Sequence, residues 1–170
     1  TTGTQNTVIG ASAGVALTTG GNNVAVGFEA LKNEDAHGLN TAIGTQALFT
    51  QNAGADAYNV GVGYQAGAAI TTGTNNTLIG GLAGDATTTG ERNTSVGTSS
   101  LTTNTTGSGN SAFGFKSLEN STTASNNTAF GQDTLRATTT GADNVAVGMD
   151  ALTANTTGTF NVAVGGTALD

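Results

Sequence analysis

Residues 40–44 read Asn-Thr-Ala-Ile-Gly, and this five-residue pattern recurs along the whole chain. Its general form is Asn, then usually Thr or Val, then a residue that is mostly small, then Ile, Val or Phe, and then Gly. The pattern occurs ten times, and successive copies start 17 residues apart except for one interval of 19. Such a fixed period is typical of a repeat protein, in which each unit stacks on its neighbours.

Two positions of the pattern never vary. The Asn position is occupied by Asn6, Asn23, Asn40, Asn59, Asn76, Asn93, Asn110, Asn127, Asn144 and Asn161. The Gly position is occupied by Gly10, Gly27, Gly44, Gly63, Gly80, Gly97, Gly114, Gly131, Gly148 and Gly165. Stacked Asn side chains bond to one another and to nearby backbone. We therefore interpret both columns as a structural ladder.

The repeat predicts an all-β fold. Helical hairpin repeats need more than about 30 residues, and a Gly in every seven or so residues disfavours a helix. The alternation in Asn-Val-Ala-Val-Gly indicates a short strand, and Gly and Asn at its ends suit tight corners. Each 17-residue unit is therefore one coil of a parallel β-solenoid. Ten coils spaced about 4.8 Å apart make a rod about 45–50 Å long.

We expect one repeat array over residues 1–170, with units that start near residues 3, 20, 37, 56, 73, 90, 107, 124, 141 and 158. Two extra residues near 54–55 account for the longer interval. Neither end has an atypical capping repeat, so the array is expected to be a segment of a longer fibre.

Alternation along the strand also leads to an expectation about the side chains. The residue after Asn and the Ile, Val or Phe should point into the coil and meet a Leu of the opposite run. Asn, Ala and Gly should then form a flat outer face with few side chains. We expect that flat face to pack against other copies, three around an axis.

The repeats resemble known fibre proteins. Residues 40–48, Asn-Thr-Ala-Ile-Gly-Thr-Gln-Ala-Leu, resemble the N-T-A-I-G-x-x-A-L repeats of phage and viral tail-fibre shafts, and residues 23–27, 144–148 and 161–165 resemble the head repeats of trimeric autotransporter adhesins. The resemblance implies a left-handed β-roll, a homotrimer, and an extracellular, cell-surface or virion location. The adhesin unit is usually shorter, about 14 residues, so the corners here must hold about three more.

Composition excludes several classes. The formal net charge is −7 with only four Lys and Arg residues, which argues against nucleic acid and anionic membranes as partners. There is no Cys for a disulfide framework, and no run of 18 apolar residues that would insert in a membrane. Leu, Ile, Val and Phe make up only about 19% of the chain, so order has to come largely from backbone ladders.

Nothing in the sequence predicts catalysis. The single His, His37, lies in an irregular corner beside Glu34 and Asp35, which we interpret as solubilising charges rather than an acid–base pair. Asp85 and the other Asp residues fall mostly in different columns, so no calcium-binding repeat is indicated. We expect no enzyme activity, no metal and no cofactor.

The least repetitive surface is the predicted contact loop. His37, Tyr58 and Tyr64 surround the charged corner and the two-residue insertion. Exposed aromatic side chains there would suit contact with a cell-surface receptor or a glycan.

Three functions are compatible with these features. The first is a non-enzymatic structural or adhesive fibre segment that mediates surface attachment. The second is an ice-binding solenoid that uses its Thr columns, although adjacent Thr residues point to opposite faces and only one of each pair can join a plane. The third, a polysaccharide-active or sugar-binding solenoid, lacks the clustered carboxylates that such enzymes need.

Overall fold

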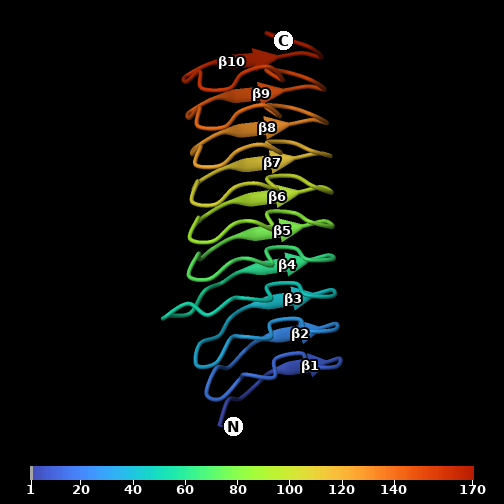
Figure 1. Cartoon of the computed structure of the whole chain (residues 1–170), viewed down its shortest axis with the longest axis vertical. Helices are drawn as coiled ribbons and strands as arrows, with labels where there is room; N and C mark the ends of the chain where they lie inside the picture. Colours follow the sequence, from blue (N-terminus) through green and yellow to red (C-terminus); the bar gives the residue numbers. More distant parts are fainter. Residues whose placement is uncertain (1) are drawn as a thin grey trace.

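The computed structural model describes residues 2–170 as a single stack of coils (Figure 1). Each coil contributes one three-residue strand to a ten-stranded parallel sheet, whose strand order follows the chain. The N- and C-termini lie at opposite ends of the stack. The strands are β1 (Thr7–Ile9), β2 (Val24–Val26), β3 (Thr41–Ile43), β4 (Val60–Val62), β5 (Thr77–Ile79), β6 (Thr94–Val96), β7 (Ser111–Phe113), β8 (Thr128–Phe130), β9 (Val145–Val147) and β10 (Val162–Val164).

The prediction of a parallel β-solenoid is confirmed. Neighbouring strands pair in register, so that Ala25 lies beside Ala42 and Ala42 beside Gly61. The 19-residue interval between β3 and β4 keeps this register because its extra length protrudes from the stack as a loop around exposed residues 54–56 (Figure 1). Equivalent residues of successive coils therefore form continuous columns along the rod.

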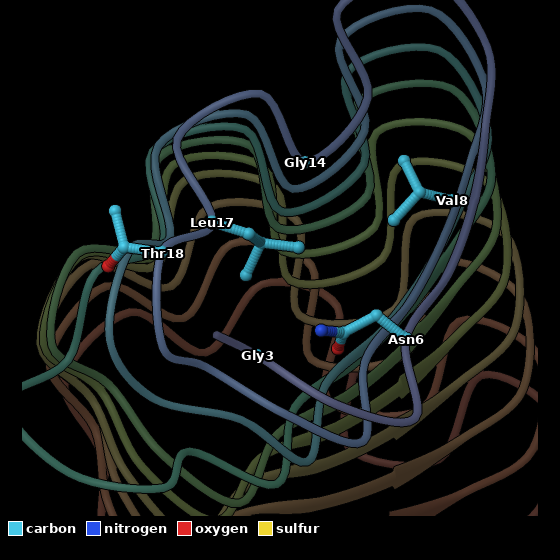
Figure 2. Close-up of a pocket in the computed structure, with 6 residues that line it drawn as sticks. All are labelled: Gly3, Asn6, Val8, Gly14, Leu17 and Thr18. Carbon is cyan, nitrogen blue, oxygen red and sulfur yellow. The ribbon is translucent and has the colours of Figure 1, made fainter. Parts of the chain in front are cut away.

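The expected direction of the side chains is wrong. In the third coil Asn40 and Ala42 are buried, whereas Ile43 is 40% exposed. Asn and the middle strand residue therefore face the interior, and the first and third strand residues face outward. Figure 2 shows the same arrangement in the first coil, where Asn6, Val8 and Leu17 point into the coil. The Asn-Ala-Gly face is thus internal and cannot be the surface that packs against other copies.

The narrow interior explains this direction. It holds an Ala opposite a Leu, as with Ala42 and Leu48, both fully buried. When the middle residue is larger, the Leu is replaced by Gly: beside Leu78, a Cβ atom on Gly84 would lie 2.8 Å from the Leu78 Cδ2 atom. Two bulky residues per strand would overfill this space, and overpacking is destabilising.

The Leu column takes an unusual backbone conformation. Leu48 has a φ of 49° and Leu118 one of 54°, and Gly67 has the same left-handed conformation in its coil. A left-handed non-Gly residue costs about 1–2 kcal/mol. Full burial of a Leu side chain is worth about 1.5–3 kcal/mol, so Leu is tolerated wherever its side chain fills the coil.

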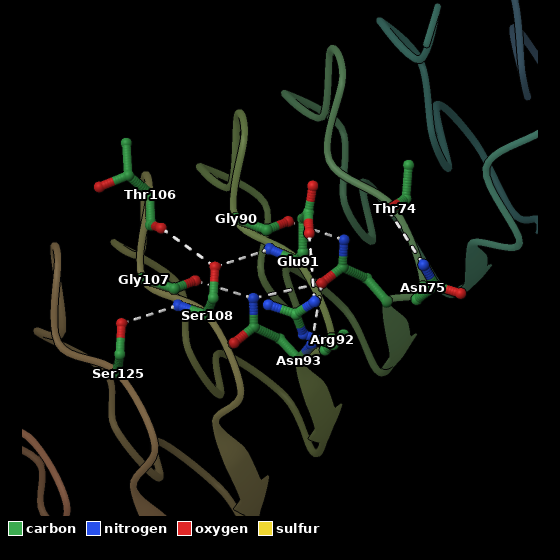
Figure 3. Close-up of polar contacts among 11 residues, drawn as sticks. Thr74, Asn75, Gly90, Glu91, Arg92, Asn93, Thr106, Gly107, Ser108 and Ser125 are labelled. Carbon is green, nitrogen blue, oxygen red and sulfur yellow. Dashed lines mark hydrogen bonds and ion pairs between the residues drawn. The ribbon is translucent and has the colours of Figure 1, made fainter. Parts of the chain in front are cut away.

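The Asn ladder runs through the interior. In nine successive steps the backbone N–H of each Asn donates to the side-chain Oδ1 atom of the Asn one coil earlier, at 2.8–3.2 Å. The side-chain amide also crosses the coil, and Asn93 Nδ2 donates to the Gly107 carbonyl at 2.9 Å (Figure 3). Each Asn therefore joins two coils and closes one corner.

The invariant Gly residues allow neighbouring coils to approach closely. Gly97 has a φ of 140°, which side chains disfavour, and a Cβ atom there would lie 2.4 Å from the Gly114 carbonyl oxygen. The Gly column is required both by its backbone conformation and by this contact.

Replacement of one ladder residue should destabilise the whole rod. Asn93→Ala leaves the Asn110 N–H buried without its partner, while the Gly107 carbonyl loses one of two amide donors and keeps Asn104 Nδ2. A buried group left unpaired costs about 1–3 kcal/mol, so the free energy of unfolding should fall by roughly 1–3 kcal/mol in urea denaturation. Asn120→Ala, at an exposed Asn, is the control and should change it by less than about 0.5 kcal/mol. Equal effects of the two substitutions would contradict this account.

Candidate functional site: the outward face of the sheet

One regular surface of the rod is the outer side of its parallel sheet, which runs over all ten strands. We call it the outward sheet face and define it by the first and third residues of every strand. The first-residue column is Thr7, Val24, Thr41, Val60, Thr77, Thr94, Ser111, Thr128, Val145 and Val162. The third-residue column is Ile9, Val26, Ile43, Val62, Ile79, Val96, Phe113, Phe130, Val147 and Val164.

The outward sheet face is uncharged and mostly apolar. It contains only Thr, Ser, Val, Ile and Phe. Its third-residue column remains accessible in the middle of the rod, where Ile79 is 39% and Phe130 41% exposed. The rings of Phe113 and Phe130 stack with centroids 4.4 Å apart. Further exposed apolar side chains flank the face two residues after the strands, at Phe28, Tyr64, Phe115 and Met149.

The parallel pairing makes this exposure unusual. Parallel sheets are normally covered on both faces, and this sheet is covered only by its own coil. Contiguous exposed apolar surface of this extent marks interaction sites on soluble proteins. The surface can pack against another apolar face, and its twenty strand residues include no titratable side chain.

The Thr columns form a second regular surface. Most coils carry a pair of adjacent Thr residues, such as Thr88 and Thr89. The first Thr of each pair donates its hydroxyl to a carbonyl of the next coil, as Thr88 does to Thr105 and Thr105 to Thr122, both at 3.0 Å. The second Thr of each pair is exposed. These exposed residues are Thr19, Thr72, Thr89, Thr106, Thr123, Thr140 and Thr157.

The residues of the predicted contact loop lie on different segments. Tyr58 and Tyr64, each 55% exposed, stand before and after β4, at opposite ends of that strand. His37 lies partly buried in the preceding coil, at a corner. The joint use of the three residues as a contact surface stays a prediction.

The interpretation of Glu34 as a solubilising charge is wrong. Its side chain is fully buried, and burial raises the pKa of the Glu34 carboxyl. Glu34 stands 11 residues after Asn23, and residues at this spacing from the ladder Asn point inward in other coils too, as Gln51 and Thr87 do. Alignment of the coils on the ladder Asn would have revealed this from the sequence.

A cavity of about 230 Å³ opens at the first coil. Gly3, Asn6, Val8, Gly14, Leu17 and Thr18 line it (Figure 2). These residues belong to the columns that contact a neighbouring coil elsewhere in the stack, and none of them is titratable. The cavity is thus the exposed interior of a coil rather than a site with its own chemistry.

No protein-family model, no curated protein and no solved structure matches this chain. Among residues 2–170, no helix is long and apolar enough to cross a membrane.

Asp85 provides a test of the electrostatics of the rod. Burial raises the pKa of its carboxyl, opposed in part by bonds from the backbone N–H groups of Asp85 and Ala86, and one buried carboxylate oxygen has no hydrogen-bond partner. The folded state therefore holds this proton more tightly than the unfolded state, in which the carboxyl has its ordinary pKa of about 3.9. Ionised Asp85 destabilises the fold, and its penalty disappears as the pH falls through the raised pKa.

Asp85→Asn should consequently be more stable than the natural chain at pH 7. The difference should shrink as the pH is lowered towards about 4, because both chains are then neutral at this position. Thermal unfolding followed by circular dichroism between these pH values measures the effect. A variant less stable at pH 7, or a difference independent of pH, would contradict the assignment.

Proposed function

We propose that the chain is a non-enzymatic structural segment of an extracellular or virion fibre that mediates surface attachment. In this proposal it is the shaft or head of the fibre, and three copies associate around an axis through their outward sheet faces. The observation that carries the proposal is the uncharged, apolar outward sheet face, which continues over all ten strands. The resemblance of the repeats to fibre proteins supports the same reading.

The energetics favour association. Full burial of a Val, Ile or Phe side chain is worth about 1.5–3 kcal/mol. The third-residue column contains ten such residues that are only partly covered, so covering them supplies on the order of 10 kcal/mol. Association of two proteins costs about 4–15 kcal/mol in lost freedom, so the gain from covering this column is of the same order as the cost that it has to offset.

The shape also suits a fibre. Stacked coils repeat every 4.8 Å or so, and each presents the same columns in the same direction. Corners and loops can vary without disturbing the stack, as the loop around residues 54–56 does. A cell-surface receptor or glycan would be bound by such variable parts or by neighbouring regions of the fibre.

The first test is the mass of the chain in solution, measured by sedimentation or light scattering. A mass near three chains is expected, because the outward sheet face is then covered. A folded single chain at micromolar concentration would contradict the proposed assembly.

A matched pair of variants then locates the interface. Val96→Glu places a charge in the middle of the outward sheet face, where burial against a partner would be costly. Thr106→Glu places the same charge on the exposed Thr column. We expect the first variant to sediment as a single chain and the second to keep the mass of the natural assembly. Dissociation by Thr106→Glu alone would place the interface elsewhere.

Ice binding is the second candidate, and the exposed Thr column favours it. The second Thr of each pair recurs at the coil spacing, and except at Thr19 its hydroxyl makes none of the bonds to the next coil that the first Thr makes. Thermal hysteresis at millimolar protein concentration, lost in Thr106→Glu and kept in Val96→Glu, would support this function. Absence of hysteresis would eliminate it.

A further inference from the structure

One corner of the rod departs from the repeat in its chemistry. Residues 87–90 and 138–141 both read Thr-Thr-Thr-Gly, and the aligned residues 34–37 read Glu-Asp-Ala-His. We call Glu34, Asp35 and His37 the Glu34 corner. Three residues with metal-binding side chains thus replace hydroxyl and Gly positions in a single coil.

The three side chains of the Glu34 corner converge. Each offers one ligand atom, and these atoms lie within 4.8 Å of one another. Glu34 is 0% exposed, and its Oε1 atom accepts a hydrogen bond from the His37 backbone N–H at 3.1 Å. Asp35 and His37 are partly exposed, which leaves the corner open to ions from solution.

Two buried atoms at this corner have no partner. The Glu34 Oε2 atom and the His37 Nδ1 atom are both inaccessible to solvent and make no hydrogen bond. Buried polar atoms are nearly always paired, and an unpaired buried carboxylate is especially costly. A bound cation would satisfy both atoms together.

No basic side chain supplies the missing positive charge. The nearest Lys in the sequence, Lys32, is paired with Glu29 at 2.6 Å. Over residues 2–170, no ion pair involves Glu34 or Asp35. Asp56 adds a further carboxylate nearby, since its Oδ1 atom accepts a hydrogen bond from the Gly38 N–H at 3.0 Å.

We propose that the Glu34 corner binds one divalent first-row transition-metal ion of the Zn²⁺ type. The ligands are one carboxylate oxygen each of Glu34 and Asp35 and the Nδ1 atom of His37, with water in the remaining position. Imidazole together with carboxylates suits Zn²⁺ and its neighbours, whereas Ca²⁺ and Mg²⁺ prefer oxygen ligands alone. Tetrahedral bonds of about 2.0–2.1 Å to such an ion place the ligand atoms about 3.3–3.4 Å apart, so the corner has to close by up to about 1.5 Å from the present separations of 4.8 Å or less.

The ion would strengthen a coil that has lost one link to its neighbour, since its three ligands all come from that coil. In regular coils the first Thr of the pair donates its hydroxyl to the next coil, as Thr88 does to Thr105. Asp35 stands at this position and its carboxylate has no hydrogen to donate. The ion bound at the Glu34 corner would therefore hold together the coil that precedes the protruding loop.

The test uses the full chain without a polyhistidine tag, because His37 is the only His. Titration calorimetry with Zn²⁺ should show one ion per chain with micromolar or tighter affinity. Glu34→Thr and His37→Gly should each weaken binding at least tenfold. Both substitutions restore residues that other coils carry here, so both variants should fold. Asp150→Asn, which removes one negative charge elsewhere, is the control and should bind as the natural chain does.

A second measurement remains decisive if a variant fails to fold. The single imidazole of the natural chain gives one set of ¹⁵N resonances, and Zn²⁺ should shift that of Nδ1. Saturable binding with a shifted Nδ1 resonance supports the site. Absence of binding, unchanged affinity in both folded variants, binding of Ca²⁺ but not Zn²⁺, or an unshifted imidazole would each overturn it.

Discussion

Every coil of this rod has to present the same backbone atoms to the coils above and below it. The Asn column meets this constraint, because each Asn accepts a hydrogen bond from the backbone of the following coil and closes its own corner with its amide. An Asn displaced by one residue would leave its partner N–H unpaired in the interior. The register of the sheet, the direction of the strand side chains and the positions of the corners all depend on this column.

The same constraint keeps the core small. With Asn and the middle strand residue inside, the coil has room for one large side chain, which is a Leu in most coils. In the fifth coil the large residue is the middle strand residue, Leu78, and the Leu column holds Gly84 instead. The first coil has the same arrangement, with Val8 in the strand and Gly14 in the Leu column. The larger apolar side chains are left outside, on the outward sheet face. The apolar outward sheet face is thus the consequence of an interior too narrow to hold these side chains.

The surfaces of the rod differ in how freely they can change. The outward sheet face repeats with little variation, since every coil contributes equivalent side chains to it. The corners tolerate substitution and insertion, because only their ends enter the ladders. The charged Glu34 corner and the loop around residues 54–56 are therefore where a regular scaffold can acquire individual chemistry, and they follow one another along the chain.

The period, the strand-forming pattern and the invariant Asn and Gly were sufficient to predict a parallel β-solenoid and the number of its coils. A repeat of this length with period-two alternation has few other solutions. Alternation alone, however, allows two orientations of each strand, with either the first and third residues or the middle residue facing the interior. The local sequence does not distinguish these two orientations. The width of the closed coil decides between them, because it accommodates Ala42 opposite Leu48 but not Ile43. One sequence signal for this orientation is that Gly84 takes the place of the usual Leu in the coil whose middle strand residue is the large Leu78. The approach of the Glu34 side chain to His37 depends on how this corner folds in three dimensions, so only the tertiary structure could bring these two groups together.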